Sequence, residues 1–417
     1  MDAVLALLGA GMADVHGRLT DGRGAQVPGR VLDLHHVWDF YRSRFLLRRV
    51  RAYRRFLDVA DELAWECYGP VLGLAGARPK EPPLVGFSRA ASPRAHRRGS
   101  AYHDLLPRGG IHTREGREAA ARLPFPVIDV PWSFGSHLPA LLTVAHEAAH
   151  HIDDDCGLGD EIRRRVAAAG LPPDRAGHWA RWSGEAFADV CAAVLCGPAY
   201  TAALAELLDT GDGGDCGDDG DHADIGCGMD AVDERDFDGA HPPPGVRLRL
   251  SAAAARLAGH PGEPDDSDDS DDSDDSDDSE NGREARAVAR ALAQGGWSGL
   301  DGQSLPELFA AGRPSGRNEV PEGARRLLAG GPSRCSSAAG VLAAAALAFR
   351  HDPAGYDGRA VGERAMAEVL RLRAAGTRAV PSADPSAGDR GRAHAAAGRA
   401  VLAALDASSG PSPIDSG

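Results

Sequence analysis

Two histidines stand four residues apart, with a glutamate directly after the first, in the stretch TVAHEAAHHI at residues 143–152. A separation of four is about 1.1 turns of α-helix, so His146 and His150 would project from one face and could bind a single metal ion. Glu147 would lie about 100° around the helix, where it can reach a metal-bound water and act as general base. His151 would point to a different face, and we interpret it as a surface or supporting polar residue.

A catalytic zinc site usually has three protein ligands and one open position, so a third ligand must come from elsewhere. Glu185 and Asp189 are again four residues apart, in the apolar run SGEAFADVCAAVLC. We expect this run to form a helix from Ser183 to Gly197. Two carboxylates in so apolar a helix need partners. We predict that Glu185 is a metal ligand and that Asp189 accepts the free ring N–H of a ligand histidine, which fixes the tautomer of that histidine.

The order of these residues resembles the gluzincin clan of zinc metallopeptidases, to which thermolysin belongs. A later block, HPPPGVR, places His241 and Arg247 six residues apart. The three blocks together, which span residues 146–247, are similar to the CAAX prenyl endopeptidases and their smaller soluble relatives. In that group the resemblance implies that His241 and Arg247 line the site, where they stabilise an oxyanion or hold the ligand glutamate.

The same resemblance implies a zinc-dependent peptidase that acts on a peptide or protein substrate. It implies Zn²⁺ bound by His146, His150 and Glu185, with Glu147 as the base and Asp189 orienting His146. The chain has no membrane spans, unlike the prenyl endopeptidases, so a prenylated substrate is not implied. Two other interpretations stay open. The same zinc site could serve a regulatory or sensor protein that binds a partner without proteolysis, or the side chains could form a metal-free polar network.

The chain is expected to be an α+β protein, mostly helical, with a zincin-like core of a small sheet and an active-site helix. The runs at 83–88 (PPLVGF) and 124–131 (PFPVIDVP) are β-branched and bounded by proline, which indicates strands. Residues 89–115, between them, are expected to be loop. By analogy with the resembled fold, we predict that the stretch from Pro126 to Val130 is an edge strand on which a peptide substrate pairs.

Helices are expected on both sides of this sheet. Residues 31–68 fit one or two amphipathic helices. Ser136 is a good N-cap, so the helix that carries the paired histidines should run from His137 to about Ile152. The stretch 241–260 is expected to be a turn that leads into a helix.

Composition divides the chain into four parts. They are a metallopeptidase domain at 1–260 (its core about 31–260, with an acidic Gly/Asp insert at 211–240), an acidic DDS-repeat linker at 261–282, an Ala-rich helical region at 283–375 and a disordered tail at 376–417.

The charge of the chain is concentrated in the linker. The formal net charge is −15, and without the ten aspartates of residues 265–279 it would be −5. We therefore expect no nucleic-acid surface. The basic run from Arg42 to Arg55 is interpreted as a solvated helix face, with a patch for an anionic partner as the alternative.

Other features bear on the compartment. No stretch offers about 18 consecutive apolar residues, so we expect no membrane insertion. A signal peptide begins with a basic segment, but here Asp2 follows Met1, so we expect no signal peptide. The seven cysteines contain no C-x-x-C pair, which is typical of cytosolic thiols. The expected location is cytoplasmic, and the sequence does not predict an oligomeric state.

Overall fold

A computed structural model describes residues 2–74, 82–96, 126–209, 241–260, 279–314, 316 and 318–374. The chain forms two compact units. The first contains Met1–Phe45, Arg98–Pro124 and Ala379–Gly417, and the second contains Leu46–Arg97 and Phe125–Arg378. The insert at 211–240 and the tail at 376–417, both predicted above, lie outside the described residues.

In the first unit, helix α1 (Asp2–Thr20) is followed by a short 3-10 turn, η1 (Gly24–Gln26), and by α2 (Val27–Leu47). Gly11 faces the side chain of Leu34, and a Cβ at position 11 would overlap the Leu34 methyl groups. A glycine at this position therefore allows the two helices to approach closely.

The second unit contains the sheet, which has three strands: β1 (Leu84–Ser88), β2 (Arg94–His96) and β3 (Val127–Pro131). Their order is β1-β3-β2, with β1 parallel and β2 antiparallel to β3. The strands predicted within 83–88 and 124–131 are confirmed. The prediction that residues 126–130 form an edge is wrong, because β3 is the central strand and all five of its residues are buried. The expected loop at 89–115 contains β2, whose three residues lack the β-branched pattern that marks a strand.

The outer edge of β1 is covered by polar side chains. Arg48 Nη2 donates to the Val85 carbonyl at 2.7 Å, and the Val85 N–H donates to Asp61 Oδ1 at 3.1 Å. Arg48 and Asp61 also form an ion pair with an N–O distance of 2.7 Å. Asp61 belongs to α3 (Arg51–Tyr68), which packs against β1, so these contacts join the helix to the sheet.

The helix that carries the paired histidines differs at both ends from the prediction. Two 3-10 segments, η3 (Trp132–Ser136) and η4 (Leu138–Thr143), precede α5 (Val144–Cys156). Ser136 does not cap a helix, because its hydroxyl donates to the Ser133 carbonyl at 2.9 Å. At the other end α5 continues through three aspartates to Gly157, which ends the helix in the left-handed conformation (φ 65°) that glycine adopts without strain.

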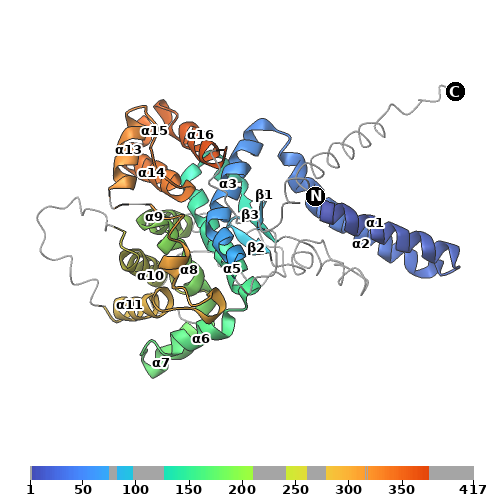
Figure 1. Ribbon diagram of the computed structural model, residues 1–417, viewed down its shortest axis with the longest axis horizontal. Helices are drawn as coiled ribbons and strands as arrows, with labels where there is room; N and C mark the ends of the chain where they lie inside the picture. The colour runs from blue at the N-terminus through green and yellow to red at the C-terminus, as the bar shows by residue number, and fades with distance from the viewer. Residues whose placement is uncertain are drawn as a thin grey trace, which may run out of the picture. The chain divides into compact units, whose positions relative to one another are not determined.

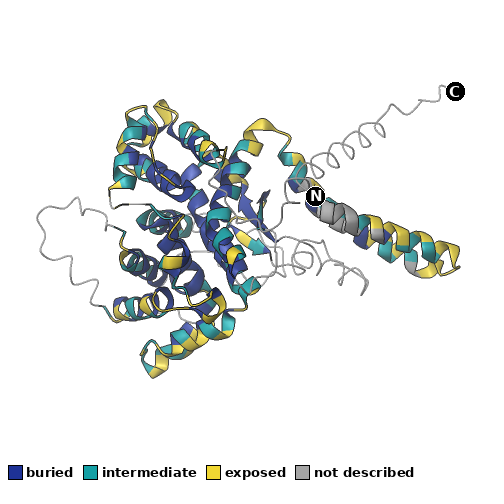
Figure 2. Ribbon diagram, in the orientation of Figure 1, coloured by how far each residue is buried: buried dark blue, intermediate teal, exposed yellow. Residues whose placement is uncertain are grey.

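Helix α8 (Ser183–Cys196) matches the helix expected from Ser183 and runs through the interior of the unit, where it packs against α5. Its side chains are small and apolar over most of its length, and Figure 2 shows it coloured as buried along most of its course. Helix α10 confirms the expected turn and helix at 241–260. The neighbouring helices are α6 (Gly159–Ala167), α7 (Pro173–Arg181), α9 (Pro198–Asp209) and α10 (Pro244–Leu257).

Helices after position 279 share the same core as these elements. Helix α11 (Glu280–Ala293) packs against α10 and α8, and α14 (Ala338–His351) packs against α3, η4 and α13 (Glu319–Leu328) (Figure 1). These later elements are α11 (Glu280–Ala293), η6 (Ser298–Leu300), α12 (Leu305–Leu308), α13 (Glu319–Leu328), α14 (Ala338–His351), α15 (Pro353–Gly358) and α16 (Val361–Ala374); η2 (Gly69–Gly73) follows α3.

The described part of the chain is mostly helical with one small sheet, in agreement with the α+β prediction. None of the helices in that part combines the length and the hydropathy that a bilayer span requires.

Candidate metal centre

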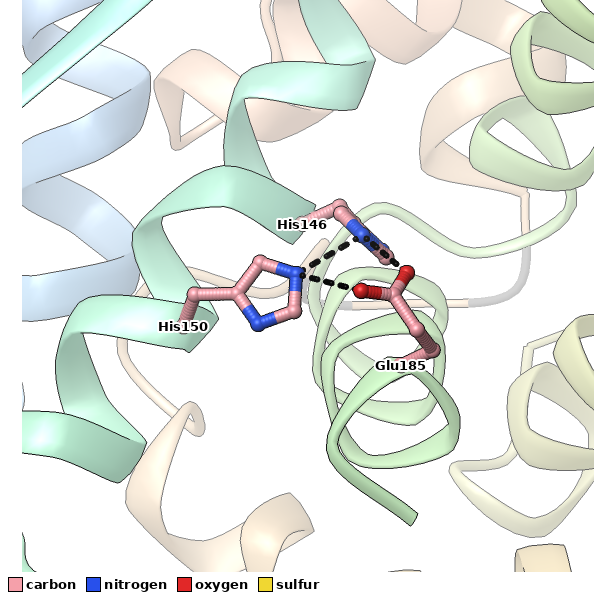
Figure 3. Close-up of side chains that lie close together, drawn as sticks. All are labelled: His146, His150 and Glu185. Atoms are coloured by element: carbon pink, nitrogen blue, oxygen red, sulfur yellow. Dashed lines mark hydrogen bonds and ion pairs between the residues drawn. The ribbon is translucent and has the colours of Figure 1, made fainter. Parts of the chain in front are cut away.

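Two neighbouring helices bring three potential ligands together. Helix α5 presents His146 and His150 one turn apart, and the first turn of α8 presents Glu185. Figure 3 shows the two imidazoles and the carboxylate pointing toward a common point from these two helices. One ligand atom from each side chain lies within 4.8 Å of the others. The structure therefore brings together the three residues that the sequence predicted as ligands.

The spacing of the ligand atoms is compatible with a single zinc ion. The Nε2 atoms of His146 and His150 are 3.1 Å apart. Glu185 Oε2 lies 3.3 Å from Nε2 of His146, and the other oxygen, Oε1, lies 3.4 Å from Nε2 of His150. Ligands bound tetrahedrally at about 2.0–2.1 Å stand roughly 3.3 Å from one another. Two imidazole nitrogens and a carboxylate oxygen also form a donor set typical of catalytic zinc, so the residues present fit this ion.

A second group of side chains fixes the His146 ring from behind. Asp189 Oδ1 lies 2.8 Å from His146 Nδ1. The Tyr200 hydroxyl donates to Asp189 Oδ1 at 2.6 Å and lies 3.2 Å from the same ring nitrogen. Arg247 donates to both Asp189 oxygens, at 2.8 Å from Nε and 2.7 Å from Nη2. With Nδ1 occupied in this way, Nε2 is the His146 nitrogen that faces His150 and Glu185.

The electrostatics of the cluster favour positive charge between the carboxylates. Burial opposes a charge on His146, but Asp189 and Glu185 outweigh it and raise the pKa of His146 to about 10. Burial likewise opposes ionisation of Glu185, but the two histidines bring its pKa well below the usual value. The pKa of Asp189 is also lowered, because Arg247 and His146 outweigh its burial. Both carboxylates are therefore ionised at neutral pH and attract a cation.

Glu147 lies beside this cluster in a pocket of about 330 Å³. The pocket is also bordered by Arg94 and Ala95 of β2, and by Leu204 and Leu207 of α9. Glu147 is 8% exposed and lines the same pocket as the three predicted ligands. The role of general base that the sequence predicts for Glu147 stays a prediction.

The two residues of the HPPPGVR block occupy different positions. The exposed ring of His241 lies at the pocket, with Nε2 3.8 Å from Glu185 Oε1. Arg247 is buried, and its closest partner is Asp189; its Nη2 lies 3.8 Å from Glu185. Arg247 was expected to stabilise an oxyanion or to hold the ligand glutamate, but its close hydrogen bonds go to Asp189 and not to Glu185.

Sequence reasoning missed one residue and left two places open for another. His151 is not a surface residue: it is buried, with Nε2 3.3 Å from the Val127 carbonyl, so it contacts β3. Tyr200 belongs to no motif in the sequence. Its position shortly after the α8 helix, preceded by Gly197 and Pro198, is the one signal that α9 turns back toward the site.

Comparison of the chain with protein families, with curated proteins and with solved structures finds no match.

Proposed function

We propose that the protein is a zinc-dependent metallopeptidase. The observation that supports this proposal best is the convergence of His146, His150 and Glu185 toward one point, with Asp189 fixing the rear nitrogen of His146. A metal-free polar network would account for the buried charges but would not require both histidine Nε2 atoms to face one carboxylate. The resemblance to gluzincins adds the reaction class to this geometry.

Zinc held by these three residues would polarise a water molecule and the scissile carbonyl group. Glu147 would accept a proton from the water as the water oxygen attacks the carbonyl carbon. It would then deliver that proton to the amine nitrogen as the C–N bond breaks. His241, at the pocket, is placed to donate a hydrogen bond to the carbonyl oxygen. Arg247 is less suited to that role, because both of its bonded nitrogens serve Asp189.

Strand β2 is a better candidate than β3 for pairing with an extended substrate. Arg94 and Ala95 border the pocket, and β2 is paired with β3 on one side within the described residues. A peptide that added to its other side would pass the histidines, with backbone hydrogen bonds providing affinity. Leu204 and Leu207, on the α9 side of the pocket, favour an apolar substrate side chain nearby.

Metal content is the first test. Purified protein should contain about one zinc per chain by elemental analysis, and His146→Ala should lose it. His351→Ala is the matched control, because His351 is exposed and belongs to no described contact; it should retain the metal. A wild-type protein that takes up no zinc after dialysis against the metal would exclude the proposal.

Hydrolysis is the second test. Glu147→Gln should keep the zinc and lose cleavage of a peptide mixture followed by mass spectrometry, because the amide cannot accept the proton. Zinc binding with no cleavage in either protein, for any peptide, would favour the regulatory or sensor interpretation. Cleavage that survives in Glu147→Gln would show that Glu147 is not the base.

A further inference from the structure

A group of large apolar side chains is exposed around the start of α3. Leu46, Val50, Tyr53 and Trp132 are 39%, 49%, 39% and 42% exposed. They are all of the large hydrophobic residues exposed in the described part of the second unit. Figure 2 colours the beginning of α3 as exposed. Exposed apolar side chains that gather in one place, while the rest of a surface lacks them, mark a contact site.

The aromatic members of the group are held rigidly. The Trp132 ring stacks on Phe87 of β1, with ring centroids 4.6 Å apart and planes 9° apart. Tyr53 meets Trp132 edge to face, with centroids 5.4 Å apart. Phe56 of α3 also stacks on Phe87, from within the core. Trp132 is therefore oriented on the surface by its contacts with Phe87 and Tyr53.

Exposed arginines lie close to these residues along the chain. Arg49 and Arg51 flank Val50, and Arg89 lies two residues after Phe87. All three are exposed, and within the described ranges no carboxylate pairs with any of them. Arg54 is exposed as well and has a single distant partner, Asp58, at 3.5 Å. We name these four arginines, together with Leu46, Val50, Tyr53 and Trp132, the α3 face.

We propose that the α3 face binds the surface of an anionic lipid bilayer. Exposed Trp and Tyr side chains favour the headgroup region, and clustered arginines attract acidic headgroups. A nucleic acid would satisfy the arginines and could stack on Trp132, but it offers nothing to the aliphatic side chains of Leu46 and Val50. A lipid surface satisfies both kinds of residue.

The net negative charge of the chain does not oppose this binding strongly. At physiological ionic strength a charge acts over about 8 Å, so the local arginines outweigh acidic residues elsewhere. The proposal concerns adsorption to a surface and needs no membrane-spanning helix. It is independent of the proposed peptidase activity and of zinc.

Co-sedimentation of the full chain with vesicles tests the proposal. Wild type should bind vesicles of phosphatidylcholine with 30% phosphatidylserine and should bind pure phosphatidylcholine far more weakly. Replacing Arg49, Arg51 and Arg89 together by Gln should weaken binding on the order of 100-fold, from the typical contribution of each basic residue near such a surface. Trp132→Ala should remove the part of the binding that survives about 0.5 M salt, where electrostatic attraction is screened.

A matched control uses three arginines elsewhere. Arg164, Arg283 and Arg290 are exposed and have no described ion pair, so their triple Gln variant has the same net charge change and should bind as wild type does. Thermal unfolding of each variant checks that it is folded. Equal loss in both triple variants, or binding of a single-stranded RNA in place of the acidic vesicles, would overturn the proposal.

Discussion

His146 is the residue on which the candidate site depends most. Its Nδ1 faces Asp189 and Tyr200, and its Nε2 faces His150 and Glu185. Each nitrogen thus has a separate function, because one is held by the protein interior and the other is directed at the ligand cluster. Such an arrangement fixes the ring orientation and makes the free nitrogen a better metal ligand.

Loss of the Asp189 charge should therefore weaken zinc binding. We expect Asp189→Asn to raise the dissociation constant by about 10- to 100-fold, measured by competition with a chromophoric chelator below the unfolding temperature. Tyr200→Phe should have a smaller effect, because Arg247 still holds the carboxylate. Asp209→Asn, at the exposed end of α9, is the control and should change nothing. Unaltered affinity in Asp189→Asn would show that the carboxylate does not support the ligand.

Single residues of the site could be predicted from the sequence where a helix fixes their relation. The spacing of four places His146 beside His150, and Glu185 beside Asp189, whatever the rest of the chain does. Tyr200 could not be predicted in this way. Its hydroxyl reaches Asp189 because α9 folds back after α8, and that turn depends on packing between separate helices.

At the scale of elements, a local pattern predicts where a helix begins and ends, but it does not predict which strands pair. Helix α8 begins and ends where its sequence indicates, since Ser183 and Gly197 mark its ends. The position of β3 in the centre of the sheet depends on β2, a strand of three residues whose pairing no local pattern encodes. The sequence therefore predicts an edge at a strand that lies in the centre of the sheet.

Helix α14 begins at a carboxylate from another helix, and this contact should make stability depend on pH. Glu66 of α3 accepts the N–H groups of Ala338 and Ala339 at 2.6 and 2.7 Å. Burial is the larger effect and raises the pKa of Glu66 to about 7, although both N–H groups lower it. Because the folded protein holds this proton more tightly than the unfolded chain, stability should fall as the pH rises from about 4.5 through 7.

Comparison with Glu66→Gln isolates that contribution. Between pH 5 and pH 8 the unfolding free energy of wild type should fall relative to the variant by about 3 kcal/mol at most, from the size of the pKa change. Urea unfolding of both proteins at the two pH values measures this difference. A constant difference would mean that Glu66 is ionised throughout.

Two helical glycines should respond in opposite ways to substitution by Ala. In α13 a Cβ at Gly323 would lie 2.9 Å from the Cys335 sulfur and 3.0 Å from the Ala344 Cβ, so Gly323→Ala should destabilise the protein by about 1–3 kcal/mol. A Cβ at Gly177 in α7 would meet nothing within 4 Å, so Gly177→Ala should stabilise it by up to about 1 kcal/mol. Chemical unfolding compares the two, and a stable Gly323→Ala protein would contradict this account of the α13–α14 contact.

At the scale of the whole molecule, the acidic repeat does not divide the described helices into separate cores. Glu284 of α11 is 4% exposed; it accepts hydrogen bonds from Arg175 at 3.1 Å and from the Trp179 indole at 2.8 Å. Both partners lie in α7, before the repeat in the chain. The Ala-rich sequence predicts that these later helices bury one face, but it cannot say which elements that face will meet.

A cut in the repeat should therefore leave the two parts of the second unit together. With a specific protease site inserted among residues 265–279, the fragments should co-elute in gel filtration after cleavage and separate only in denaturant. We expect this because α10 and α11, which lie on either side of the repeat in the chain, pack against each other. Insertion of the same site without protease treatment is the control. Fragments that separate under native conditions would show that this core is not enough to hold them.

The contacts of Arg48 and Asp61 with Val85 have a consequence for how copies of the protein behave toward one another. A free sheet edge is a template on which the strand of another molecule can pair, and such pairing leads to aggregation. At β1 the Val85 carbonyl and N–H are already bonded to side chains of the same chain. Replacing either side chain would expose this edge to neighbouring molecules. At Val85 the two residues thus oppose pairing with a strand of another molecule, a property distinct from the stability of the single folded chain.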